Sequence, residues 1–186
     1  VKFQLYDSLS LYGERQKTEL TQDQAFKLFE YGQSLNMPVF FSVFDMERIK
    51  YCREMGVSAI KIAASKARDY EFVEYAAQGD MPIIISIYGM PYKLPGWLKF
   101  YKWLYCVPHY PTELTELHFS QMNGFDGFSD HTIGLTAVKI ALARGVSIIE
   151  KHFAINYKTG VDAQWSMIPA ELNELRVFAN NVSEVL

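Results

Sequence analysis

Strand-like and helix-like segments alternate along almost the whole chain, and this alternation limits the possible folds more than any other feature. Short apolar runs of β type are separated by segments in which apolar residues recur at helical spacing. Such an order is typical of βα units joined into a parallel sheet. We expect seven strands, at residues 1–5, 38–42, 59–63, 82–87, 102–107, 125–131 and 147–152.

The helices between these strands carry recognisable start signals. Thr21 and Gln24 have the spacing of a capping box, which predicts a helix from about residue 21 to residue 36. Pro169 suits the first turn of a helix near the end of the chain. The segment 91–96 holds two prolines and a glycine, so we expect no full helix there. Helices are predicted at 21–36, 46–55, 70–77, 135–143 and 169–185.

Parallel strands joined by helices form either an open doubly wound sheet or a barrel. No glycine-rich phosphate loop follows the first strand, which argues against the dinucleotide-binding version. Polar residues instead follow the carboxyl ends of several strands, as in barrel enzymes. We predict an α/β fold of the (β/α)8 TIM type, a single domain over residues 1–186. Seven strands are visible, and we expect a first strand upstream of Val1.

Composition excludes several other classes of protein. Eighteen basic residues stand against 21 acidic ones in 186 residues, without a long basic run, so we expect no nucleic-acid partner. The longest apolar run, 81–85, is too short to cross a membrane. Cys52 and Cys106 lie in apolar stretches and are expected to be buried thiols. These features predict a cytoplasmic protein without a membrane partner.

Two histidines, each at the end of a predicted strand, form the strongest candidate site. His131 and His152 are 21 residues apart, about one βα unit, so they should occupy equivalent positions on neighbouring strands. Two converging imidazoles would bind a metal and leave coordination positions open for a substrate. The alternative is that each histidine is a buried, hydrogen-bonded core residue. Their matched positions and their acidic neighbours, Asp130 and Glu150, favour the metal.

Two lysines lie inside otherwise apolar strands. Lys2 and Lys61 must each reach water or meet an anion, because an unpaired buried ammonium group is costly. Together with the hydroxyls of Ser86 and Ser129, they would suit a phosphate or carboxylate ligand. The alternative is that a lysine pairs with a structural carboxylate such as Glu150.

Two further residues are candidates for contacts with a substrate. Tyr110 precedes Pro111 at the end of a strand, where it would line a pocket or simply pack. Asp162 lies in the loop after the last strand, where its carboxylate would accept a hydroxyl group or be solvated.

Together these motifs resemble the N-acetylneuraminate (sialic acid) synthase family, which includes related nonulosonic acid synthases and spore-coat polysaccharide enzymes. Ser-Asp-His-Thr at 129–132 and Glu-Lys-His-Phe at 150–153 are the most specific of them. Weaker matches lie in the same order at 1–4, 60–62, 82–86, 110–112 and 160–162.

The resemblance implies a barrel enzyme that condenses phosphoenolpyruvate with an N-acylated amino sugar, such as N-acetylmannosamine. Phosphate is released, and the product is a nine-carbon 2-keto acid. His131 and His152 would bind a divalent metal, manganese first and magnesium as the alternative, which polarises the sugar aldehyde. Both substrates are small molecules, and a homodimer is compatible with the family. The implied substrate-binding residues are Lys2, Gln4, Lys61, Ser86, Tyr110, Ser129 and Asp162, of which Tyr110 and Asp162 would contact the sugar.

The sequence also departs from the family pattern. The family's catalytic glutamate lies on a strand that would precede Val1, so no catalytic residue is assigned, and the carboxyl-terminal antifreeze-like domain has no counterpart. Pro108 replaces a polar residue, and the segments 42–45 and 63–65 lack the usual hydroxyl and glycine residues. Two alternatives follow. One is a degenerate barrel that binds a metal or an anionic sugar without catalysis, and the other is a different sugar synthase that uses phosphoenolpyruvate.

Overall fold

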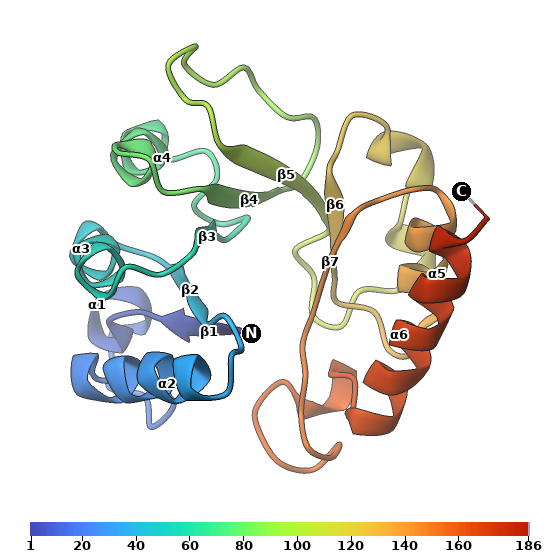
Figure 1. Ribbon diagram of the computed structural model, residues 1–186, viewed down its shortest axis with the longest axis horizontal. Coiled ribbons are helices and arrows are strands. Elements are labelled where there is room, and N and C mark those ends of the chain that lie inside the picture. The colour runs from blue at the N-terminus through green and yellow to red at the C-terminus, as the bar shows by residue number, and fades with distance from the viewer. Residues whose placement is uncertain (186) are drawn as a thin grey trace. The chain divides into compact units, whose positions relative to one another are not determined.

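In the computed structural model, which describes residues 1–185, strands and helices alternate as predicted (Figure 1). All seven predicted strands are confirmed, and their ends differ from the predicted ends by at most two residues. The first four strands pair in parallel in the order of the chain, and so do the last three. The strands are β1 Lys2–Leu5, β2 Phe40–Val43, β3 Ile60–Ile62, β4 Ile83–Ile87, β5 Tyr101–Cys106, β6 Gly127–Asp130 and β7 Ile148–Lys151.

The five predicted helices are also present. The capping box of the first is confirmed, since Thr21 Oγ1 accepts from the Gln24 amide at 3.2 Å and Gln24 Oε1 accepts from the Thr21 amide at 2.9 Å. The segment between β4 and β5 contains no helix, as expected. The helices are α2 Gln22–Ser34, α3 Met46–Met55, α4 Tyr70–Ala77, α5 Thr136–Ala143 and α6 Pro169–Ser183.

A short helix and three 3-10 turns were not predicted. Helix α1, Ser8–Tyr12, has only five residues and no amphipathic period, and it begins because the Asp7 carboxylate accepts from the amides of Leu9 and Ser10. Such a start depends on one side chain and is difficult to recognise in a sequence. The 3-10 turns are η1 Leu114–Glu116, η2 Phe119–Met122 and η3 Ala163–Trp165.

The chain divides into two compact units. Unit 1 holds Val1–Ile85 and Lys93–Tyr101, and unit 2 holds Ser86–Tyr92 and the chain from Lys102 onward. In unit 1 the parallel pairs are β1 with β2, β2 with β3, and β3 with β4. In unit 2, β5 pairs with β6 and β6 with β7. Each pairing joins strands that are consecutive in the sequence, as the βα order requires.

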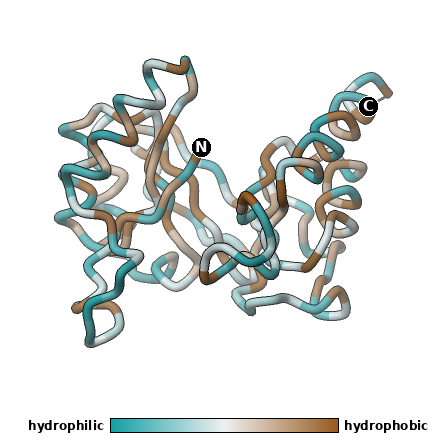
Figure 2. The backbone as a smooth tube through the Cα atoms, turned by 90° about the horizontal axis from the view of Figure 1, so that it is seen from below, coloured by the Kyte–Doolittle hydropathy of each residue, from teal (hydrophilic) through white to brown (hydrophobic). Residues whose placement is uncertain are grey.

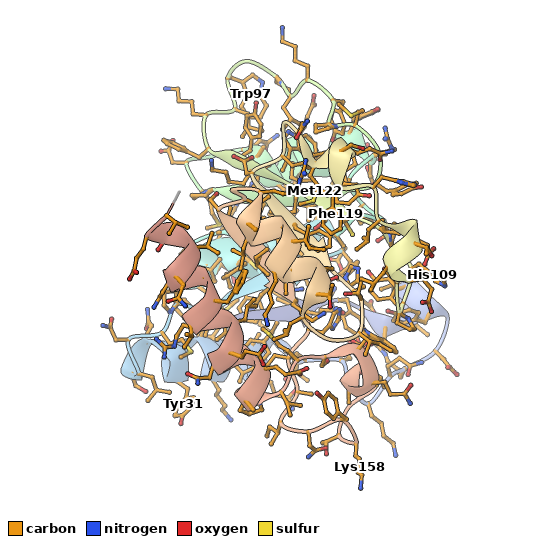
Figure 3. All side chains as sticks on the ribbon, turned by 90° about the vertical axis from the view of Figure 1, so that its right-hand side faces the viewer. Tyr31, Trp97, His109, Phe119, Met122 and Lys158 are labelled. Carbon is orange, nitrogen blue, oxygen red and sulfur yellow. The ribbon has the colours of Figure 1, made fainter. Side chains whose placement is uncertain are left out.

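The core of unit 2 lies between its strands and the helices α5 and α6. Tyr105 of β5 and Phe128 of β6 are fully buried, with ring centroids 6.0 Å apart. Met122 belongs to this core and Phe119, from the same turn, packs against it; both are labelled in Figure 3. Helix α6 carries both apolar and polar segments in Figure 2, and only its Leu175 is buried. Its amphipathic pattern therefore matches a helix that covers a core on one side.

Among residues 1–185, no helix is both long enough and apolar enough to cross a lipid bilayer.

Gly127 at the start of β6 is a position where the fold requires glycine. A Cβ atom there would lie 2.3 Å from the Ile148 carbonyl oxygen and 2.7 Å from the Leu104 side chain. We expect Gly127→Ala to lower the free energy of unfolding by about 3 kcal/mol, because backbone cannot move aside as a side chain can. Gly96→Ala is the control, since its Cβ meets nothing within 4 Å. Equal urea midpoints for the two variants would contradict this packing.

Cys52 of α3 provides a second test of the core. The side chain is fully buried, and burial raises the pKa of its thiol to about 12. In a Cys106→Ser background, we expect Cys52 to resist a thiol reagent at pH 8 until denaturant is added, with labelling at least roughly 100-fold slower in the native protein. Rapid labelling of the native protein would show that α3 opens readily.

Candidate functional site

The structure brings the two strand-end histidines together in unit 2. His131 follows β6 and His152 follows β7, and the strands pair with Ser129 opposite Glu150. The centroids of the two imidazole rings are 5.5 Å apart. The predicted convergence is therefore observed, and metal binding by this pair remains a prediction.

Both rings use the same nitrogen to contact an oxygen acceptor. His131 Nδ1 lies 3.2 Å from the Val107 carbonyl oxygen, and His152 Nδ1 lies 3.3 Å from Asp162 Oδ2. A carbonyl oxygen can only accept, so Nδ1 of His131 carries the proton, and the Asp162 carboxylate favours the same tautomer in His152. In this tautomer the lone pair of each ring lies on Nε2. Histidines that bind metals are usually anchored in this way.

The pair can supply only part of a coordination sphere. His131 is 6% exposed, and the side chain of His152 is 19% exposed. Residues 1–185 contain no group of three or more histidine, cysteine, aspartate or glutamate side chains arranged to hold a metal. Two nitrogen ligands alone would leave positions for water or substrate oxygen atoms, which suits a Lewis acid better than a structural metal.

Tyr110 lies against the histidines. Its ring centroid is 4.1 Å from that of His131 and 6.2 Å from that of His152, and about half of the residue is exposed. The Trp165 ring centroid is 6.3 Å from that of Tyr110. Trp165 Nε1 is buried without a hydrogen-bond partner among the described residues. Tyr110 was predicted to be near a substrate, whereas Trp165 was not singled out. A lone tryptophan at the end of a short 3-10 turn has no pattern by which the sequence could identify it.

Two acidic residues next to the histidine positions have different surroundings. Glu150 shares the histidine face of the strands and accepts a hydrogen bond of 2.9 Å from Ser129 Oγ. Asp130 instead lies on the opposite face, where its carboxylate is 2.6 Å from Lys151 Nζ. Its interpretation as an acidic neighbour supporting the metal was wrong, because adjacent residues of a strand point to opposite faces.

His109 follows β5 but does not join the pair. Its Nδ1 lies 2.9 Å from the Glu116 carboxylate, and the ring is exposed at the periphery of the molecule (Figure 3). The backbone amide of Glu113 and, second, the His109 ring hold the pKa of Glu116 below its usual value.

The candidate anion ligands of unit 1 lie in one row across three strands. The register places Gln4 opposite Ser42 and Ser42 opposite Lys61, and Lys2 lies on the same face of β1 two residues before Gln4. Lys61 is 2% exposed, and its Nζ donates to the Ile62 carbonyl oxygen at 3.0 Å. A buried ammonium group in such a row suits an anionic ligand.

Ser86 of unit 2 has a buried hydroxyl group, and Oγ has no hydrogen-bond partner in the part of the chain that the structure describes. A buried hydroxyl group without a protein partner is unusual, and a water molecule or a ligand would satisfy it. This fits the predicted role of Ser86 in anion binding, a role that remains a prediction.

Parallel βα units with polar side chains at the strand ends define a domain of the α/β barrel class. The model of the NeuB family matches residues 2–93 and 99–186, and the chain therefore belongs to the NeuB family. The resemblance to sialic and nonulosonic acid synthases is thereby confirmed.

The relatives include proteins that are named as synthases of nonulosonic acids. The chain is 26% identical over 191 residues to the N,N'-diacetyllegionaminic acid synthase of Legionella pneumophila, with 91% of the chain and 53% of that protein covered. It is also 26% identical over 201 residues to a pseudaminic acid synthase of Campylobacter jejuni, with 99% and 58% covered. The chain spans a little over half the length of these curated relatives.

A crystal structure gives the same result for the fold. The N-acetylneuraminic acid (sialic acid) synthetase of Leptospira borgpetersenii, solved with citrate, superposes with a TM-score of 0.87 at 25% identity. The match covers 99% of the chain and 73% of the crystallised one. The predicted α/β fold of the barrel type is confirmed.

Proposed function

We propose that the chain forms the barrel part of a synthase that condenses phosphoenolpyruvate with an N-acylated amino sugar to a nonulosonic acid, with release of phosphate. The observation that carries the proposal is the histidine pair, in which the ring centroids are 5.5 Å apart and each Nδ1 contacts an oxygen acceptor. Membership of the NeuB family supports the reaction class, and the names of the relatives support nonulosonic acids as products.

His131 and His152 would hold the divalent metal, manganese first, which supplies a Lewis acid for the sugar aldehyde when it is bound. The Val107 carbonyl oxygen and the Asp162 carboxylate keep both rings in the tautomer that can bind it. Tyr110, half-exposed against both rings, would limit the space available to the sugar.

Phosphoenolpyruvate carries phosphate and carboxylate groups, which require fixed donors and positive charge. Lys61 and Lys2 would provide the charge, and Gln4 and the hydroxyl groups of Ser86 and Ser129 would provide neutral donors. The buried Ser86 hydroxyl group supports this assignment, because an anion would satisfy it.

The test is to measure phosphate release from phosphoenolpyruvate by the protein that contains this chain, with manganese and a panel of acylated amino sugars led by N-acetylmannosamine. We expect release that requires phosphoenolpyruvate, sugar and metal together. Omission of the sugar controls for plain hydrolysis. If the protein bound manganese and phosphoenolpyruvate but released no phosphate with any sugar, synthase activity would be refuted. A binding protein that has lost catalysis would then be favoured.

A further inference from the structure

A buried ion pair lies on the face of β6 and β7 that is opposite the histidine face. Asp130 Oδ2 and Lys151 Nζ are 2.6 Å apart, and both side chains are completely buried. The two residues face each other in the strand register. They immediately precede His131 and His152, so the pair joins the two strands one residue before the two imidazoles.

The pair also holds the backbone beyond His131. Lys151 Nζ donates to the Thr132 carbonyl oxygen at 2.6 Å, and Asp130 Oδ1 accepts from the Thr132 amide at 2.9 Å. Asp130 Oδ2 further accepts from Thr132 Oγ1 at 3.2 Å. The residues on both sides of His131 are thus connected to the residue that precedes His152.

The backbone of His131 is also held from its other side, by Thr112. The Thr112 amide donates to the His131 carbonyl oxygen at 3.0 Å, and Thr112 and Thr132 form an isolated parallel bridge. His131 therefore has its backbone held by Thr112 and by the residues around Lys151, while its ring is held by Val107. Little freedom remains for the ring to move relative to His152.

A buried ion pair is a weak explanation of stability, because apolar side chains of similar volume often stabilise a core equally well. Directed hydrogen bonds define one spacing and one register between two strands, which apolar packing does not. We propose that Asp130 and Lys151 are positioning residues that set the distance and tautomers of His131 and His152 for a divalent cation. This inference rests on the proposed function of the histidine pair.

The test compares two ion pairs of unit 2 that receive the same substitutions. Asp130→Asn with Lys151→Met removes the charges of the proposed positioning pair while keeping an acceptor for the Thr132 amide. Asp126→Asn with Lys102→Met is the matched control, because Lys102 Nζ and Asp126 Oδ1 are 2.7 Å apart but lie near the opposite ends of the strands. Asp130→Asn alone replaces the first variant if that variant does not fold.

The first measurement needs no metal. Nitrogen-15 NMR of the imidazoles reports the tautomer, and we expect both histidines of the unsubstituted protein to carry the proton on Nδ1. The Asp130 and Lys151 substitutions should convert His131, His152 or both to a mixture of tautomers, whereas the control should not. A variant that is less stable but keeps both tautomers would overturn the proposal.

The second measurement is the affinity for manganese alone. We expect a 10- to 100-fold loss in the Asp130 and Lys151 variant, the range found for residues that orient metal ligands, and no loss in the control. Unchanged affinity would overturn the proposal. If the unsubstituted protein bound no manganese but the tautomers still responded, the proposed metal function would fail while the positioning role would stand.

Discussion

Replacing His131 or His152 with alanine is expected to weaken manganese binding by more than roughly 100-fold, since changes that merely disturb the orientation of a ligand already cost 10- to 100-fold. Each substitution removes one of the two proposed nitrogen ligands, and residues 1–185 contain no group of three or more possible ligand side chains to replace it. Sugar-dependent phosphate release should fall with the metal affinity, because the aldehyde loses its electrophile.

Titration calorimetry of the two variants with manganese measures this directly, and His109→Ala is the matched control. His109 also follows a strand of unit 2, but its ring is exposed and paired with Glu116, so its loss should leave manganese affinity unchanged. Should all three variants bind manganese like the unsubstituted protein, His131 and His152 would be structural core residues.

The order of strands and helices could be predicted because it is encoded locally. The residues Ile60 and Ile62 on either side of Lys61 are fully buried, which gives β3 the apolar character of a strand in a parallel sheet. The capping box of α2 depends on two residues three positions apart. Helix α1 was missed because its start depends on one Asp7 side chain and its length is too short for a period to appear.

The convergence of the two histidines could also be predicted, since their spacing of one βα unit places them at equivalent strand ends. The environment of each ring could not be predicted. The Val107 carbonyl oxygen and the Asp162 carboxylate reach the rings from separate loops, and only the folded chain brings them there. Asp130 was counted as support for the metal because it is next to His131 in the sequence, but alternation along the strand places it on the opposite face.

Lys61 is the residue whose loss should most affect phosphoenolpyruvate. Methionine has a similar length and no charge, and we expect Lys61→Met to lower kcat/KM for phosphoenolpyruvate by roughly 100- to 1,000-fold, the usual cost of removing one preorganised electrostatic contact. The effect should be large because the ammonium group is almost completely buried, where water screens its charge little.

Lys66→Met is the matched control, because Lys66 lies in the same unit shortly after β3 and its Nζ is 3.6 Å from Asp69 Oδ2. Its side chain is 31% exposed, and such pairs contribute little, so phosphoenolpyruvate use should be unaffected. Manganese affinity should be retained in both lysine variants, which separates loss of the anion site from loss of the metal site. A Lys61→Met protein that remains folded and uses phosphoenolpyruvate normally would assign this buried charge to the structure of unit 1 and leave the anion to other donors.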